Sequence, residues 1–206
     1  YRRLPTFLGT ISYPELRYFI HQKQKKSMRK ILQDKININD INKICIMTHG
    51  KENDHRKEEL YQLTFDENDL VSFNALWAFT HFDEANNPWL FQKHDALIDR
   101  VLAEKNETKR RLMLQLLLRQ PFEEESLRSD FIDFCIAKIT VCSQSYAIRS
   151  YCMKLAYEQM KYYPELLEEL RMALDMLEQE VLSPGMLSAK RQIMKKIKRS
   201  LGSFGK

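Results

Sequence analysis

Apolar residues recur along this chain at helical spacing, in a pattern that returns every 37 residues. Between Leu60 and Glu158 an apolar stripe, a polar break and a denser apolar stretch follow one another three times. The breaks fall at residues 67–69, 104–108 and 142–145. Apolar positions three and four residues apart share one face of a helix, so each copy predicts two consecutive helices.

The three copies can be aligned position by position. In the first helix of each copy, the predicted buried columns are Leu60, Leu97 and Phe134, then Tyr61, Ile98 and Cys135, then Phe65, Leu102 and Ile139. In the second helix they are Trp77, Leu114 and Tyr151, then Phe79, Leu116 and Met153. A fourth copy is expected to continue the first-helix columns with Met172 and Met176, and to end in a helix from about Met186 to Ser200.

A helical hairpin of this length cannot bury enough surface alone, so tandem hairpins must stack and share one core. The period lies between about 34 for tetratricopeptide or about 33 for ankyrin repeats and about 40 to 47 for HEAT and armadillo repeats. The sequence signatures of the first two families are absent. The chain therefore resembles HEAT and armadillo repeat proteins. That resemblance implies an all-α fold, a right-handed stack of about five antiparallel helix pairs forming an α-α superhelix, with an irregular helical bundle as the alternative.

We expect a single all-helical repeat domain over residues 1–206. Its N-terminal pair is divergent, with a first helix from Ser12 and a second near residues 36–47. Gly202, Ser203 and Gly205 indicate a frayed end. The expected parts are a cap pair at 1–48, HEAT-like helix pairs at 54–200 and a tail at 201–206.

Composition narrows the class of protein. The 44% hydrophobic content is ordinary for a globular chain, and no apolar run approaches the ~18 residues that cross a bilayer. The chain does not begin with the apolar segment and cleavage site of a secretory signal. We therefore expect a cytoplasmic protein with no membrane contact. The cysteines lack CxxC spacing and are expected to be reduced and structural: Cys45, Cys135, Cys142 and Cys152.

No catalytic motif stands out in the sequence. A nucleophile elbow, a phosphate-binding loop and a dinucleotide fingerprint are all missing. His49 and His55 lie among acids, but without the helical spacing of a metal site. We expect no metal and no cofactor, and we favour a protein that is not an enzyme.

The leading functional hypothesis is a scaffold whose stacked second helices form a concave surface for a protein or peptide partner. Aromatic residues dominate interface hot spots, and basic residues would add electrostatic attraction. The candidate interaction residues are Trp89, Arg100, Lys109, Arg110, Arg111, Tyr162, Tyr163, Lys195 and Lys196.

The alternative is a nucleic-acid-binding protein, resembling the bacterial alkylpurine DNA glycosylases built from HEAT-like repeats. That family has a basic concave face with an aspartate, tryptophans and arginines. No position here matches a family motif residue by residue, so no catalytic role is transferred. The residues of compatible type are Trp77, Trp89, Asp83, Asp99, Arg100, Arg110 and Arg111. The charge on the second helices should separate the two hypotheses.

Overall fold

A computed structural model of the chain describes residues 28–83, 85–179 and 182–204. Within these ranges the regular structure consists of eleven α-helices and three short 3-10 helices, without any strand. The all-α fold expected from the apolar spacing is confirmed for this part of the chain. The helix expected from Ser12 lies outside the described residues.

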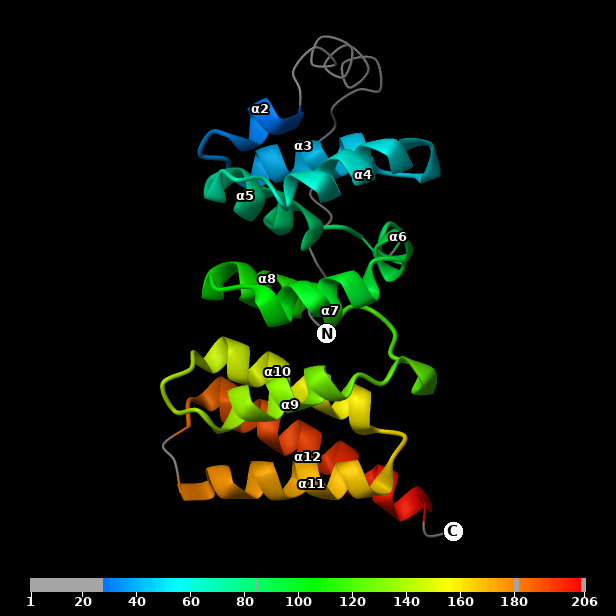
Figure 1. Cartoon of the computed structure of the whole chain (residues 1–206), viewed down its shortest axis with the longest axis vertical. Coiled ribbons are helices and arrows are strands. Elements are labelled where there is room, and N and C mark those ends of the chain that lie inside the picture. The colour runs from blue at the N-terminus through cyan, green and yellow to red at the C-terminus, as the bar shows by residue number, and fades with distance from the viewer. Residues whose placement is uncertain (1–27, 84, 180–181, 205–206) are drawn as a thin grey trace. The chain divides into compact units, whose positions relative to one another are not determined.

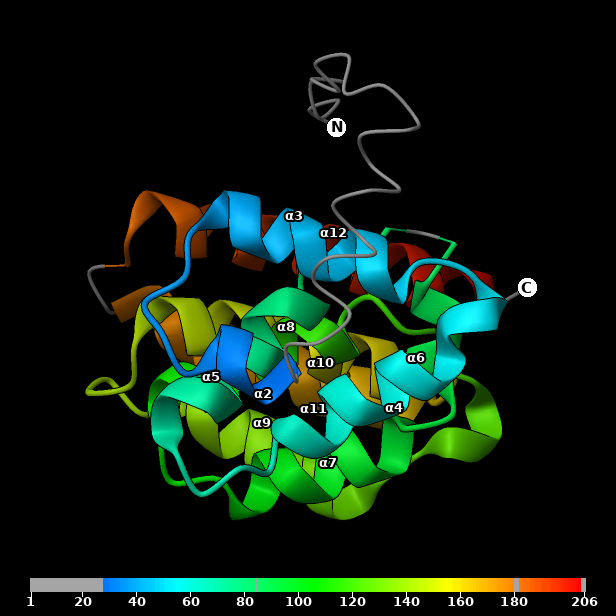
Figure 2. The same cartoon turned by 90° about the horizontal axis from the view of Figure 1, so that it is seen from above.

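The chain divides into two compact units, residues 1–81 and 82–206. In unit 1, α5 packs against α2, α3 and α4 (Figure 2). The buried Asn74 amide of α5 donates to the carbonyls of Leu32 at 2.9 Å and Asp34 at 3.2 Å, which ties down the end of α2. Helix α3 confirms the helix predicted near residues 36–47. The helices of unit 1 are α2 (Met28–Leu32), α3 (Ile38–Thr48), η1 (Lys51–Asn53), α4 (Asp54–Leu63) and α5 (Asp69–Phe79).

Unit 2 contains three consecutive helix pairs (Figure 1). Helix α10 packs against α8 and α12, while α9 contacts α7 and α11. The first helices of the pairs therefore form one layer and the second helices another. The first helices are α7 (His94–Ala103), α9 (Ser129–Thr140) and α11 (Pro164–Asp175), and the second helices are α8 (Glu107–Leu117), α10 (Tyr146–Met160) and α12 (Pro184–Phe204). The short elements are α6 (Asn87–Phe91), η2 (Glu124–Ser126) and η3 (Met176–Gln179).

A polar side chain starts α5 and each second helix of unit 2. Asn68, Asn106, Ser145 and Ser183 accept hydrogen bonds from backbone N–H groups of the first turn, at 2.9 to 3.4 Å. Such N-caps stabilise a helix by about 1 kcal/mol each. Counted from the cap, positions 3, 4, 7, 8, 10 and 11 are buried in α5, α8 and α10 alike. The caps therefore give the register in which the second helices of successive repeats are equivalent.

The predicted alignment of the second helices is wrong by a few residues, although Phe79, Leu116 and Met153 are all buried, as predicted. Trp77, Leu114 and Tyr151 lie 9, 8 and 6 positions after their caps. The buried equivalents of Leu114 are Leu76 and Met153. Because buried positions form adjacent pairs that recur every three or four residues, a shift of one to three residues can still match apolar with apolar, and only the caps remove the ambiguity.

For the first helices, the predicted buried columns are correct at some positions and wrong at others. The column of Tyr61, Ile98 and Cys135 is buried in all three copies, which confirms it. Phe65, however, is 53% exposed. The predicted fourth copy is present as the pair α11 and α12, but its predicted buried column is wrong because Met172 and Met176 are exposed. The buried stripe of α11 consists instead of Leu167, Leu170, Ala173 and Leu174. The last helix begins close to its predicted start but continues through Gly202 and Ser203, where a frayed tail was expected.

Two buried arginines close the ends of first helices. The Arg149 guanidinium is 1% exposed and donates from Nε to the Ile139 carbonyl at 2.8 Å, at the end of α9. Arg110 donates to the carbonyls of Val101, at 3.3 Å, and Glu104, at the end of α7. The last carbonyls of a helix have no partners within it and carry the negative end of its dipole, so a buried cation is stabilised there. Both arginines stand four positions after their caps and fix how the two helices of a pair meet.

Replacing Leu114 by Ala is expected to lower the free energy of unfolding by about 2 to 5 kcal/mol, because the side chain is fully buried in α8. The neighbouring Gln115, only half-buried, is the control, and its change to Ala should cost less than about 0.5 kcal/mol. Urea denaturation measures both. Equal losses in the two variants would contradict the phase given by the caps.

Candidate functional site

The second helices of unit 2 present one row of side chains that their neighbours leave uncovered. This row, the outer strip, occupies positions 5, 9 and 13 after each cap, where no side chain is buried. It contains Arg111, Gln115 and Arg119 from the α8 region, Ser150, Lys154 and Glu158 from α10, and Ser188, Gln192 and Lys196 from α12. Since α8, α10 and α12 pack side by side, the strip crosses all three helices.

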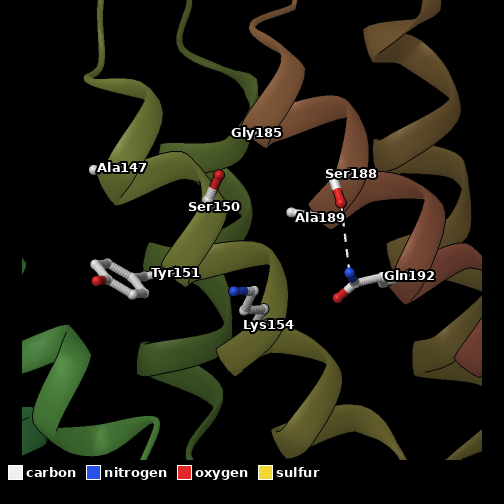
Figure 3. Close-up of a pocket in the computed structure, with 8 residues that line it drawn as sticks. All are labelled: Ala147, Ser150, Tyr151, Lys154, Gly185, Ser188, Ala189 and Gln192. Atoms are coloured by element: carbon white, nitrogen blue, oxygen red, sulfur yellow. Dashed lines mark hydrogen bonds between the residues drawn. The ribbon is translucent and has the colours of Figure 1, made fainter. Parts of the chain in front are cut away.

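A hollow of about 290 Å³ lies in the outer strip, between α10 and α12 (Figure 3). The small side chains line the middle of this hollow, and the longer polar side chains border it. Gln192 donates to the Ser188 hydroxyl at 3.4 Å along α12. The hollow therefore offers amide, hydroxyl and ammonium groups beside a shallow apolar floor. Its lining consists of Ala147, Ser150, Tyr151, Lys154, Gly185, Ser188, Ala189 and Gln192.

The cations of the outer strip differ in how they are bound. Glu158 accepts from Lys161 at 3.0 Å and from Lys196 at 3.2 Å, and Arg119 donates to the Phe82 carbonyl. Arg111 and Lys154 have neither a hydrogen-bond nor an ion-pair partner among the residues that the structure describes. These two side chains are the cations of the strip that can meet a ligand without breaking an existing bond.

Charge is divided between the two layers of unit 2. Helices α8, α10 and α12 carry eleven Lys or Arg and two Glu, whereas α7, α9 and α11 carry three Lys or Arg and eight Asp or Glu. Part of the acidic layer is paired internally: Arg128 binds Asp99 and Asp130 at 2.7 Å each, and its guanidinium lowers the pKa of the Asp130 carboxyl. An anion is therefore attracted to the second helices and repelled by the first.

The basic residues predicted as interaction candidates do not gather on one surface. Lys109 and Arg110 are buried, Arg100 is half-buried on the first helix α7, and only Arg111 of this group belongs to the outer strip. Lys196 also belongs to the strip, whereas Lys195 borders a second hollow between α11 and α12. Sequence reasoning missed Lys154, whose only signal is its position nine residues after the Ser145 cap.

The aromatic candidates are half-buried. The Tyr162 hydroxyl donates to the Phe122 carbonyl at 3.0 Å, and the Tyr163 hydroxyl to the Glu124 carbonyl at 3.4 Å, so both fasten the loop that precedes α9. Trp89 lies on α6, with the Lys93 ammonium 5.3 Å from its ring centroid. These contacts give each aromatic ring a structural role in unit 2.

The cysteines and carboxylates form no recognisable catalytic centre among the described residues. Cys135 and Cys152 are buried, and burial raises the pKa of the Cys135 thiol, which suppresses the reactive thiolate. No group of three or more His, Cys, Asp or Glu in the described ranges is placed to hold a metal ion. None of the helices described is long and apolar enough to cross a membrane.

Comparison with known families supports the repeat architecture. Residues 28–197 match the family model of the HEAT repeat domain. The chain belongs to the HEAT repeat family. The match covers most of this HEAT repeat protein and confirms the family expected from the 37-residue period. Among curated proteins none matches the chain. The handedness of the stack and the assignment of the whole chain to one domain stay predictions.

One buried titratable group in unit 2 gives a test of the structure. His94 begins α7 with 13% of its side chain exposed, and its ring meets Phe122 edge-on at 4.8 Å. Its Nε2 has no hydrogen-bond partner within the described residues, and Asp95 lies 3.7 Å from Nδ1. Burial lowers the pKa of His94, because the imidazolium would lose its hydration, and this outweighs the attraction of Asp95.

The folded protein should therefore lose stability as pH falls from neutral through about 6.5, the pKa of His in an unfolded chain. The unfolded state binds a proton there before the native state does, so the loss continues down to the lowered pKa. Urea midpoints measured from pH 7.5 to 5 should show this slope, and His94→Gln should flatten it. His55→Gln, at an exposed position, should leave the slope unchanged; an identical slope in the His94 variant would rule out this assignment.

Proposed function

We propose that this HEAT repeat protein is a non-enzymatic scaffold that binds an acidic segment of a protein partner along the outer strip of unit 2. The observation that carries the proposal is the pair of cations Arg111 and Lys154, which have no partner among the described residues, in a strip that also contains a hollow. A carboxylate can bind either cation without displacing an existing partner.

The charge of the layers supports an acidic partner over a neutral or basic one. The excess of Lys and Arg on the second helices raises the local concentration of anions and speeds their association. The first helices have the opposite excess, so the same partner is kept off that layer. Attraction on one layer and repulsion on the other orient the partner before contact.

The dimensions of the strip fit an extended peptide. Neighbouring helices lie about 8 to 10 Å apart, so a path across α8, α10 and α12 covers roughly 20 Å, or about six extended residues at ~3.3 Å each. Ser150, Ser188 and Gln192 supply donors and acceptors for peptide amide groups along the hollow. The binding peptide therefore needs one carboxylate beside Arg111 on α8, a second beside Lys154 at the hollow, and small or polar residues over the hollow itself.

A protein segment fits the strip better than duplex nucleic acid does. DNA presents one negative charge per about 1.7 Å of axis, and tight binding needs many cations free to replace its counterions. Here Glu158 already occupies Lys161 and Lys196, and Arg119 is bound to a carbonyl. The carboxylate of Glu158 would also repel a phosphate backbone crossing α10.

The test measures fluorescence anisotropy of labelled peptides of about ten residues, rich in Glu and Ser, against matched peptides in which Gln or Lys replaces Glu. The acidic peptide should bind, and Lys154→Glu should weaken it roughly 5- to 30-fold, because one attraction of about 0.5 to 1 kcal/mol becomes a repulsion of similar size. Lys105→Glu makes the same change of charge at an exposed loop position outside the strip and should alter affinity less than about twofold.

Labelled single-stranded and duplex DNA are titrated in parallel at low and physiological salt. We expect weak duplex binding that disappears at physiological ionic strength, because screening removes the few unpaired contacts. Equal peptide binding by Lys154→Glu and Lys105→Glu would contradict the outer strip as the site. DNA binding below micromolar Kd that persists in physiological salt and is lost in Lys195→Glu/Lys196→Glu would replace the proposal by the nucleic-acid alternative.

A further inference from the structure

The burial pattern of the second helices breaks at the last one. Positions 4, 8 and 11 after the cap are buried in α8 and α10, where the α10 residues are Arg149, Met153 and Ala156. Their counterparts in α12 are uncovered: Leu187 is 37% exposed, Arg191 is exposed and Met194 is half-buried. Helix α12 itself packs on α10, so α12 has a face of the kind that receives another helix. We name this face, with the neighbouring surface of α11, the end face.

A second hollow, of about 440 Å³, lies in the end face between α11 and α12. Its apolar lining, Met194, Ile197 and Leu201, is spaced three and four residues apart and so forms one stripe along α12. Seven residues of helix span about 10 Å, which is two turns. Ile197 is the buried floor, while Met194 and Leu201 are half-buried walls.

Positive charge borders this apolar stripe. Lys195 and Lys198 line the hollow, and Arg191 lies one turn before them on the same helix. In the described part of the chain, none of these three has an ion-pair or hydrogen-bond partner. Arg171, the residue that α11 contributes, binds Glu168 at 2.6 Å and Asp175 at 3.0 Å, so this side of the hollow carries one net negative charge. The positive charge without a partner among the described residues therefore lies on the α12 side.

We infer that the end face binds one amphipathic helix of a partner protein, with apolar residues in the hollow and acidic residues beside the cations of α12. A helix-in-groove contact places side chains at i, i+3 or i+4, and i+7 of the ligand opposite a stripe of this length. Carboxylates beside those positions meet Lys195, Lys198 and Arg191. This site is separate from the outer strip and does not depend on the function proposed there.

Charge complementarity decides the occupant. A second copy of the chain that docked the same face with the two α12 helices antiparallel would bring the two sets of cations together, and like charges across an interface oppose binding. An acidic helix instead gains an opposite charge on the side of the apolar contact where Arg191, Lys195 and Lys198 lie. The ligand is therefore expected to be about 15 residues long, near the length at which an isolated helix is marginally stable.

The test selects binders from a displayed library of helical peptides of about 15 residues with random surface positions, using the whole protein as bait. The enriched peptides should combine a one-face apolar pattern with an excess of Asp and Glu. A synthetic, labelled copy of the strongest binder is then titrated against variants. Lys195→Glu/Lys198→Glu and Met194→Glu should each weaken binding at least tenfold, while circular dichroism shows an unchanged helical content.

Two variants serve as controls. Met176→Glu adds the same charge at an apolar side chain that is 73% exposed outside the hollow, and Lys154→Glu alters the outer strip; both should change affinity less than twofold. Binders without an acidic excess, or equal binding by Met194→Glu and Met176→Glu, would overturn the inference. Loss of binding in Lys154→Glu would assign the peptide to the outer strip instead. A dimer seen by sedimentation and lost in Met194→Glu would make a second copy the occupant.

Discussion

Unit 2 depends on the buried guanidinium that ends each of two first helices. The carbonyls at the end of α9 need donors, and Arg149 supplies one from inside the core, where water cannot replace it. Arg110 does the same for α7. A slide of the second helix by one residue would leave a buried charge and several carbonyls without partners, at a cost of several kcal/mol. The contact therefore fixes the phase in which each pair assembles.

The phase determines which side chains remain available. In α8 and α10, position 4 after the N-cap is directed into the core, and positions 8 and 11 lie on the same face. Positions 5, 9 and 13 lie on a different face and point outward. The outer strip is thus a consequence of the packing of neighbouring pairs. The end face has the same origin: it contains positions 4, 8 and 11 of α12, which are buried in α8 and α10 but not in α12.

The roles of the charged and aromatic residues can be assigned only from the folded structure. Lys109, Arg110 and Arg111 are adjacent in sequence, yet the first two are buried and the third is on the outer strip. Tyr162 and Tyr163 have the composition of interface anchors, but their hydroxyls donate to backbone carbonyls of a neighbouring loop. A buried polar group that finds a partner in its own chain stabilises the fold and loses its value for binding.

The sequence by itself determined the class of protein: apolar spacing predicts the helices, polar breaks predict their ends, and the period identifies the repeat family. It also placed Tyr61, Ile98 and Cys135 correctly, because one buried stripe on a short helix leaves little choice. The tertiary structure decided the rest. An apolar stripe that recurs every three or four residues can be aligned with the next one in more than one way. The Asn106 cap therefore decided which residues of the other second helices are equivalent to Leu114, and packing decided which face of α11 is buried. Which cations are unpaired followed from neighbours distant in sequence, as with Lys196 and Glu158, because an ion pair depends on distance in space and not on spacing along the chain.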